Sequence, residues 1–272
     1  MAEETVAITR RGSYEPEPGR VVDFRDAVQR CLATTRFVSA DEAAQLRDAA
    51  AASAPSGPAT AVEVVGETTL AAIARLLHGH AGPVAALNFA SAKNAGGGFL
   101  TGSEAQEESL ARSSALYALL LTAEEFYLGH RASRSLLYTD AMILSPACPI
   151  FRDDDGFLLS NPHVASFITS AAPNAGAVAD NARHELPLLP AVLQRRAECV
   201  LALAASEGYR QLVLGAWGCG VFRNDPALVA RTFALHLRAD GPWAARFDRV
   251  VFSIYDSSPG KETLAAFHRE LG

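Results

Sequence analysis

Two adjacent glutamates that follow a run of glycines are the residues of this sequence best suited to chemistry. The glycines at 96–98 are separated by seven residues from Gln106, and Glu107 and Glu108 come directly after it. Carboxyl groups act as general acids and bases and are the usual agents of glycoside hydrolysis. A backbone without Cβ atoms can approach a ligand closely and turn its N–H groups toward an oxyanion. The stretch therefore predicts a site for an anionic sugar that carries a phosphate or a diphosphate.

The two glutamates need a helix to position them. Ser103 and Gln106 form a capping-box pattern, which predicts a helix that begins at Ser103 and continues to about residue 122. Glu107 and Glu108 would then lie in its first two turns, near the positive end of the helix dipole. Consecutive helical side chains point about 100° apart, so the pair cannot flank one bond as in an ordinary glycosidase. We therefore expect the two carboxylates to have separate roles.

Each part of this stretch also has an ordinary structural interpretation. The glycines alone would be a flexible loop, and the glutamates alone would be a solvated first turn. Asn94 can donate and accept hydrogen bonds as a ribose diol requires, but it could instead stabilise the loop through an Asx turn. The combination of all three in one short stretch favours a binding and catalytic site.

A second glycine-rich loop follows another predicted strand. Residues 215–222 read Gly-Ala-Trp-Gly-Cys-Gly-Val-Phe, after the apolar run 211–214 and before a predicted helix. Asn224, Asp225 and Pro226 give that helix an N-cap and a proline at its first position, and we expect it to end near Arg238. Open α/β sheets bind ligands at the carboxyl ends of their strands, where such loops lie. Together with the glycines at 96–98, this loop could hold both sides of one diphosphate.

These motifs resemble the signature of the poly(ADP-ribose) glycohydrolases, specifically the compact bacterial type built on a macrodomain. The signature is Gly-Gly-Gly, seven residues, then Gln-Glu-Glu. The similarity extends to Tyr14, residues 146–152, residues 169–174 and residues 215–222, and so covers nearly the whole chain.

The resemblance implies a role for each motif residue. Glu108 corresponds to the catalytic glutamate, and Glu107 to the neighbour that binds the ribose on the other side of the scissile bond. An aromatic residue, here Phe222, presses on the terminal ribose in the family, although core packing is the alternative for this side chain. Tyr255 ends the last strand where an aromatic residue often contacts adenine, with Phe252 and Phe267 as alternatives. The other residues expected to bind substrate are Asn94, Gly96, Gly97, Gly98, Gln106, Gly218, Gly220 and Val221.

The implied activity is hydrolysis of ribose–ribose O-glycosidic bonds of poly(ADP-ribose), mainly from chain ends, with release of ADP-ribose. Poly(ADP-ribose) or ADP-ribosylated proteins would be the substrate partners. Two alternatives remain open at this point. A macrodomain that only binds ADP-ribose needs the glycine loops but not the paired glutamates. A hydrolase of another ADP-ribosyl linkage would share both features.

The order of apolar segments predicts the fold. From residue 61, strands alternate with helices, which indicates an α/β domain, and the resemblance implies a three-layer α/β/α macrodomain with a mixed sheet. Between residues 141 and 170 we expect four short strands, with a hairpin turn at Asp153–Gly156. We expect residues 61–272 to form the catalytic domain. Residues 1–60 would be an N-terminal helical extension packed on it, with Ser39 and Glu42 as a capping box; the alternative is a partly ordered extension.

Composition excludes several classes of protein. The net charge of −6 and the sequence pI near 5.7 argue against general affinity for nucleic acid or anionic membranes. The four cysteines lack metal-site or disulfide spacing, and no segment reads as a signal peptide or a membrane span. The seven histidines form no ligand pattern, and no cation near Cys219 in the sequence would activate its thiol. We therefore expect a cytoplasmic monomer that uses neither a metal nor a cofactor.

Overall fold

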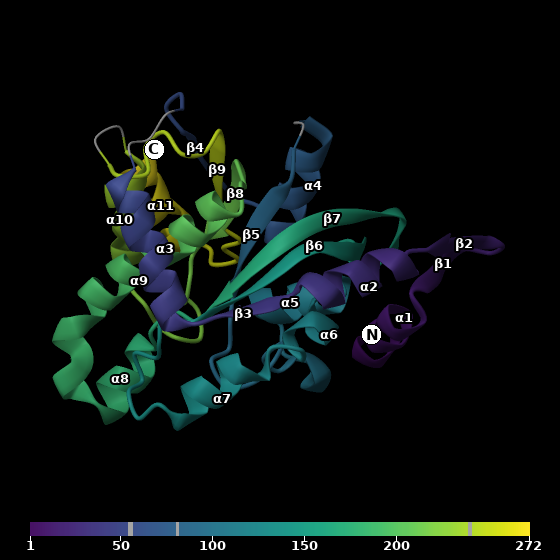
Figure 1. The fold of residues 1–272 in the computed structure, drawn as a ribbon, viewed down its shortest axis with the longest axis horizontal. Helices are drawn as coiled ribbons and strands as arrows, with labels where there is room; N and C mark the ends of the chain where they lie inside the picture. Colours follow the sequence, from purple (N-terminus) through teal and green to yellow (C-terminus); the bar gives the residue numbers. More distant parts are fainter. Residues whose placement is uncertain (54–56, 80–81, 239–240) are drawn as a thin grey trace.

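A mixed β-sheet forms the centre of the protein in the computed structural model, which describes residues 1–53, 57–79, 82–238 and 241–272 (Figure 1). Within these residues the sheet has seven strands in the order β3-β6-β7-β5-β8-β9-β4. Its strands are β3 (Arg36–Val38), β4 (Ala61–Val65), β5 (Val84–Phe89), β6 (Met142–Arg152), β7 (Leu158–Ser170), β8 (Gln211–Gly215) and β9 (Arg249–Ser253). The strands from β7 to β4 run parallel, whereas β6 pairs antiparallel with both β3 and β7. The prediction of an α/β fold with a mixed sheet is confirmed.

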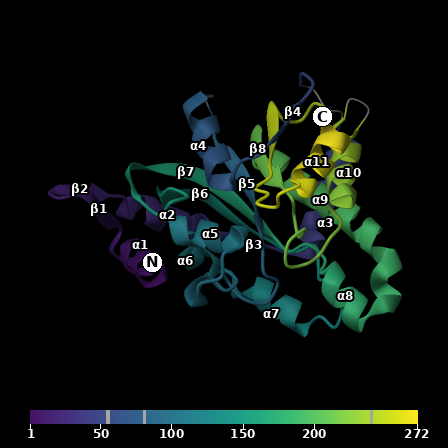
Figure 2. The same cartoon turned by 180° about the vertical axis from the view of Figure 1, so that it is seen from behind.

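Helices cover both faces of the sheet (Figures 1 and 2). They are α1 (Ala2–Arg11), α2 (Arg25–Thr34), α3 (Ala40–Ala52), α4 (Thr69–Gly79), α5 (Gln106–Ser113), α6 (Leu116–Leu120), α7 (Glu124–Ala132), α8 (Ala175–Asn181), α9 (Leu189–Ser206), α10 (Pro226–Leu237) and α11 (Glu262–Leu271). The expected start of α10 is confirmed, because Asp225 caps the helix by accepting a hydrogen bond from the Ala227 N–H and Pro226 takes the first helical position.

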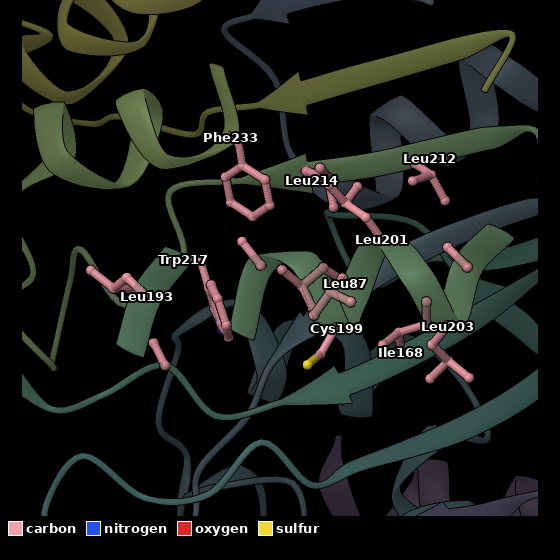
Figure 3. Close-up of a cluster of buried hydrophobic side chains, with 14 of the residues drawn as sticks. Leu87, Ile168, Leu193, Cys199, Leu201, Leu203, Leu212, Leu214, Trp217 and Phe233 are labelled. Atoms are coloured by element: carbon pink, nitrogen blue, oxygen red, sulfur yellow. The ribbon is translucent and has the colours of Figure 1, made fainter. Parts of the chain in front are cut away.

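Each face of the sheet has its own hydrophobic core, because successive strand residues point to opposite faces. Along β5, Val84 and Ala86 pack toward α2, α4 and α6, whereas Ala85 and Leu87 pack toward α9 and α10. Figure 3 shows part of the second core, in which strand residues meet α9 residues such as Leu193 and Leu201. Two cores on a single sheet give the three-layer arrangement.

Strands β6 and β7 form one long hairpin in place of the four short strands expected from the sequence. The predicted turn at Asp153–Gly156 is confirmed, since the Gly156 N–H donates to the Asp153 carbonyl at 3.1 Å. The expected break near Pro146 is instead a bulge: the register shifts between Ser145 and Cys148, and Ala147 has a φ of 50°. A bulge lets a strand accommodate proline without ending.

The N-terminal segment contributes three strands as well as helices. β1 (Ser13–Glu17) and β2 (Arg20–Asp23) form a separate hairpin, and β3 extends the main sheet at its β6 edge. The predicted cap of α3 is confirmed, because Ser39 Oγ accepts a hydrogen bond from the Glu42 N–H at 3.1 Å. A domain boundary near residue 60 stays a prediction.

The prediction of one continuous helix from Ser103 to about residue 122 is wrong both in where the helix begins and in its continuity. It begins at Gln106, with Ala105 as an N-cap that makes no side-chain capping bond, and residues Phe99–Thr101 form a short 3-10 turn. The predicted capping box fails because the Gln106 amide bonds to β5 and not to Ser103. The helix breaks at Ser114, which is extended and forms a β-bridge with Ile150. α6 and α7 continue the segment, and Glu124 and Glu125 are exposed in the first turn of α7.

Across the described ranges, no helix combines the length and the apolar character needed to cross a membrane.

Candidate active site

Both glycine loops lie at the same edge of the sheet. The first loop (residues 90–105) follows β5 and the second loop (residues 216–225) follows β8. β5 pairs in parallel with both β7 and β8, so the carboxyl ends of these strands face one way. The Trp217 indole in the second loop donates to the Ser170 carbonyl at the end of β7 at 3.0 Å. The two loops that could hold one diphosphate therefore lie at the same edge of the sheet, and their binding of a diphosphate stays a prediction.

The glycines of the first loop are packed against the two glutamates. Gly96 and Gly97 have φ values of 66° and 58°, a region that glycine enters without strain. A Cβ atom on Gly97 would lie 2.3 Å from Oε1 of Glu108 and 3.1 Å from Oε2 of Glu107. Both carboxylates therefore converge on the position where this side chain is missing.

Glu107 is enclosed by the protein, with 2% of its surface exposed. Its Oε1 accepts a hydrogen bond from Asn88 Nδ2 at 3.2 Å, and its Oε2 accepts one from the Ser91 N–H at 2.7 Å. Burial raises its pKa to about 8, and the nearby Glu108 adds to the increase, although the bonds from Ser91 and Asn88 oppose it. Glu107 is thus mostly protonated at neutral pH.

Glu108 is held more loosely and has a free oxygen. Its Oε1 accepts a hydrogen bond from the Gly98 N–H at 2.9 Å, and 8% of its surface is exposed. Among the described residues, no group donates to its Oε2. Glu108 is therefore the carboxyl of the pair that has an oxygen available to a ligand.

The Gln106 side chain bonds to the end of β5. Its Oε1 accepts from the Phe89 N–H at 2.9 Å, and its Nε2 donates to the Leu87 carbonyl at 2.8 Å and to Thr69 Oγ1 at 3.2 Å. These bonds tie the start of α5 to the strand. The expected substrate contact through Gln106 stays a prediction, and the bonds it makes here are structural.

Sequence reasoning missed Asn88 as a partner of the glutamates. Its Nδ2 also donates to Thr169 Oγ1 at 3.1 Å, while its Oδ1 is buried without a partner. The available signal was a polar residue at the carboxyl end of an otherwise apolar strand. Tyr127 on α7 is a second neighbour of Glu107 that the sequence did not reveal. Its hydroxyl is buried without a hydrogen-bond partner, and its pKa is raised, mainly by burial and to a smaller extent by the charge of Glu107.

The second loop has a buried base and an open tip. Gly218 has a φ of 71°, and a Cβ there would lie 2.4 Å from Asn224 Nδ2. No atom of the residues that the structure describes lies within 4 Å of a Cβ built on Gly220, and Val221 is 79% exposed. Phe222 is half-buried and packs against the core below the loop. Burial raises the pKa of the Cys219 thiol to about 12, which opposes thiolate chemistry there.

The remaining predicted contacts are exposed. Asn94 is exposed in the first loop, where its carbonyl accepts a hydrogen bond from the Gly97 N–H at 3.0 Å. Tyr255 lies just beyond β9 and is 75% exposed, whereas Phe252 and Phe267 are fully buried against each other. Tyr255 is thus the accessible one of the three aromatics considered for adenine.

Two other features lie apart from this edge. A cavity of about 440 Å³ opens between α1, α2 and α6, and none of the predicted site residues lines it. Among the described residues, no cluster of three or more His, Cys, Asp or Glu side chains is placed to hold a metal ion.

Two carboxyls beside two glycine loops at one sheet edge are groups that could hydrolyse a glycosidic bond in an anionic substrate, and comparison with known proteins identifies the family. Residues 2–153 match the family model described as microbial-type PARG, catalytic domain. The chain belongs to this family. A search of curated proteins found no match.

Solved structures of bacterial poly(ADP-ribose) glycohydrolases (PARG) are similar over nearly the whole chain. The Thermomonospora curvata enzyme is 48% identical, with a TM-score of 0.94 over 99% of this chain and 97% of that one. The same enzyme bound to the inhibitor ADP-HPD has a TM-score of 0.91 and 48% identity, over 98% of this chain and 97% of that one. The Deinococcus radiodurans enzyme in complex with ADP-ribose is 47% identical, with a TM-score of 0.84 over 93% and 97%.

Proposed function

We propose that this glycosidase hydrolyses the ribose–ribose O-glycosidic bonds of poly(ADP-ribose), mainly from chain ends, and releases ADP-ribose. The family model and the bacterial glycohydrolase structures support the activity and the substrate. The observation that carries the reaction is the difference between the two glutamates. Both oxygens of Glu107 are bonded by the protein, whereas Glu108 has one free oxygen beside the glycine loop.

Glu108 would act first as a general acid and then as a general base. It donates its proton to the departing ribose oxygen as the bond from that oxygen to the anomeric carbon breaks, which leaves an oxocarbenium-like centre. The Glu108 carboxylate then takes a proton from a water molecule whose oxygen attacks that centre. The proton returns to Glu108, and the products are ADP-ribose and a chain shortened by one unit.

Glu107 would bind and orient the ribose on the other side of the scissile bond. Its raised pKa makes it a neutral acid near pH 7, so it can donate a hydrogen bond to a sugar oxygen as well as accept one. Asn88 and Ser91 hold it in place. A fixed neutral acid positions the sugar without adding negative charge beside the diphosphate.

The two loops would bind the rest of the ADP-ribose unit. We assign the diphosphate to the backbone of both loops, the terminal ribose to Asn94 and Phe222, and adenine to Tyr255. The open tip of the second loop and the exposure of Tyr255 support these roles. The residues assigned to the loops are Gly96, Gly97, Gly98, Gly218, Gly220 and Val221, with Gln106 beside them.

We further propose a monomer in the cytoplasm that binds no nucleic acid. The net charge of −6 supports the lack of nucleic-acid binding. The four cysteines are unpaired and three of them are buried, which fits a reducing compartment.

Incubation with polymer from an automodified ADP-ribosyltransferase tests the proposal. We expect free ADP-ribose to accumulate from the first time points while long chains shorten gradually, as chain-end cleavage requires. Release of oligomers would point to internal cleavage, and binding without release would favour the alternative of an ADP-ribose-binding macrodomain. A substrate with one ADP-ribose on a protein side chain contains no ribose–ribose bond, so its turnover would instead favour the other hydrolase.

A further inference from the structure

The turn before β6 presents an aromatic ring to the second loop. Tyr138 has a φ of 60°, which bulky side chains rarely adopt. Its ring centroid lies 6.1 Å from that of Phe222 and 5.7 Å from that of His130. Strained backbone of this kind occurs at functional sites when the surrounding structure enforces it.

A buried arginine enforces the conformation of this turn. The Arg196 side chain on α9 is fully buried, and it donates to the Leu137 carbonyl at 2.9 Å and to the Ala171 carbonyl at 2.8 Å. Its Nε also donates to Asp140 Oδ1 at 2.9 Å. The bonds to Leu137 and Asp140 hold the chain on either side of Tyr138. The bond to Ala171 ties the turn to the segment after β7. The turn cannot shift without leaving a buried charge unpaired.

His130 supports the other side of the Tyr138 ring. Its Nδ1 lies 2.7 Å from the Phe126 carbonyl, which can only accept, so Nδ1 carries the proton. Its Nε2 lies 3.1 Å from Thr139 Oγ1, which therefore donates to it. Burial lowers the pKa of His130, so the ring is neutral at pH 7. Tyr138 thus contacts a neutral ring that is fixed at both nitrogens.

Phe222 packs against the core but is only partly enclosed. Its carbonyl accepts a hydrogen bond from the Gly176 N–H at 2.9 Å, but its side chain is half-buried and its neighbour Val221 is exposed. We propose that Tyr138 is a positioning residue for Phe222: its fixed ring holds the Phe222 side chain in the orientation that presses on the terminal ribose. The inference rests on the proposed role of Phe222 in binding that ribose.

Two variants at Tyr138 separate the contribution of the aromatic ring to substrate binding from that of the hydroxyl group. Tyr138→Leu should raise KM for poly(ADP-ribose) about three- to tenfold with kcat within about twofold, as expected for the loss of one aromatic pair. Tyr138→Phe keeps the ring and should behave as the wild type. An equal loss in both variants, or a loss in kcat alone, would overturn the inference.

A double-mutant cycle measured as ADP-ribose affinity by calorimetry tests the coupling directly. Tyr138→Leu should weaken binding in the wild-type background but have less than about a twofold effect when Phe222→Ala is present. Additive losses would show that Tyr138 does not act through Phe222. If Phe222→Ala weakens binding and Tyr138→Leu does not, only the positioning role fails. If Phe222→Ala leaves affinity unchanged, the proposed role of Phe222 fails and the inference fails with it.

Tyr138→Gly shows whether a rise in KM comes from loss of the ring or from misfolding, because glycine adopts this φ without strain. It should keep the thermal midpoint of the wild type or raise it, and still increase KM. Ala147→Gly is the matched control, since it relieves a φ of 50° at the β6 bulge, away from the loops. The control should leave KM unchanged. Wild-type KM in folded Tyr138→Gly would overturn the inference.

Discussion

The two glycine loops look alike in the sequence but serve different purposes in the structure. In the first loop, a Cβ on Gly97 or Gly98 would collide with the protein's own side chains, those of Glu108 and Ser103. At the tip of the second loop, Gly220 faces open space and Val221 is almost fully exposed. The backbone of the first loop therefore packs directly against the carboxyl groups, whereas the tip of the second loop is accessible to a ligand.

The comparison shows that a glycine can be required by what the protein already contains or by what it will bind. At Gly97 the requirement is internal, because the backbone must pass beside a carboxyl. At Gly220 no atom of the described residues would meet a Cβ, so close approach of a ligand is the reason that we propose for a small residue there. Substitutions at the two loops should accordingly have different effects.

The largest effect is expected at the carboxyl that the first loop holds. Glu108→Gln removes the transferable proton, so turnover of poly(ADP-ribose) should fall at least ~10²-fold while ADP-ribose affinity stays within roughly tenfold of the wild type. Glu124→Gln is the matched control, because Glu124 also lies in the first turn of a helix but is exposed. Retained turnover in Glu108→Gln would remove it from the mechanism.

Next in size is the effect of filling the space beside that carboxyl. Gly97→Ala places a methyl group 2.3 Å from Oε1 of Glu108 at a φ of 58°. We expect kcat to fall roughly thirtyfold through misplacement of Glu108, and the free energy of unfolding to fall by about 2 kcal/mol. Gly102→Ala has a φ of 89° and no atom within 4 Å, so it isolates the backbone cost and should keep kcat. Equal kcat values for the two variants would contradict the contact with Glu108.

The third effect is a dependence of stability on pH. Since the pKa of Glu107 is raised from 4.5 to about 8 on folding, the folded state holds this proton more tightly, and its stabilising effect is lost as pH rises toward about 8. Glu107→Gln cannot lose a proton. The free energy of unfolding of the variant minus that of the wild type should therefore increase between pH 5.5 and 7.5, by roughly 1 kcal/mol per pH unit. Urea unfolding of both proteins measures this difference; a constant difference would mean that Glu107 is ionised.

The smallest effect is expected at the open tip of the second loop. Gly220→Val adds a side chain where no protein atom lies within 4 Å, so the thermal midpoint should not change. ADP-ribose affinity, measured by calorimetry, should fall about fivefold because the side chain obstructs close approach of the backbone. Gly79→Val, where a Cβ also meets no described atom within 4 Å, should leave affinity unchanged. Unaltered affinity in Gly220→Val would place the diphosphate elsewhere.

Local patterns in the sequence predicted the fold correctly where a helix cap, a turn or a helix start is marked by its characteristic residues. The Ser39 cap, the turn at Asp153–Gly156 and Pro226 at the start of α10 were all confirmed. Local patterns failed where a distant partner competed. The capping box at Ser103 is not made because Gln106 bonds to β5, and Pro146 does not end its strand because β7 pairs through the bulge.

The candidate site was predicted in its components but not in its contacts. The motif identified Glu107 and Glu108, but not that both oxygens of Glu107 accept protein hydrogen bonds whereas one oxygen of Glu108 is free. That difference arises because the donors Asn88, Ser91 and Gly98 come from the strand end and the loop. Distances between residues that lie apart in sequence depend on the sheet pairing. The roles of the substrate-binding residues stay predictions.

The pairing of β3 with β6 has a consequence for handling the protein. The three residues of β3 pair with Met142, Ile143 and Leu144, the first three residues at the outer edge of the eleven-residue strand β6. A chain shortened to start at residue 61 would leave that edge with unpaired N–H and carbonyl groups, which is the kind of surface that recruits strands from other molecules. We therefore expect the N-terminal segment to protect the protein from edge-to-edge aggregation. A shortened chain that gives the same light scattering as the full one would contradict this role.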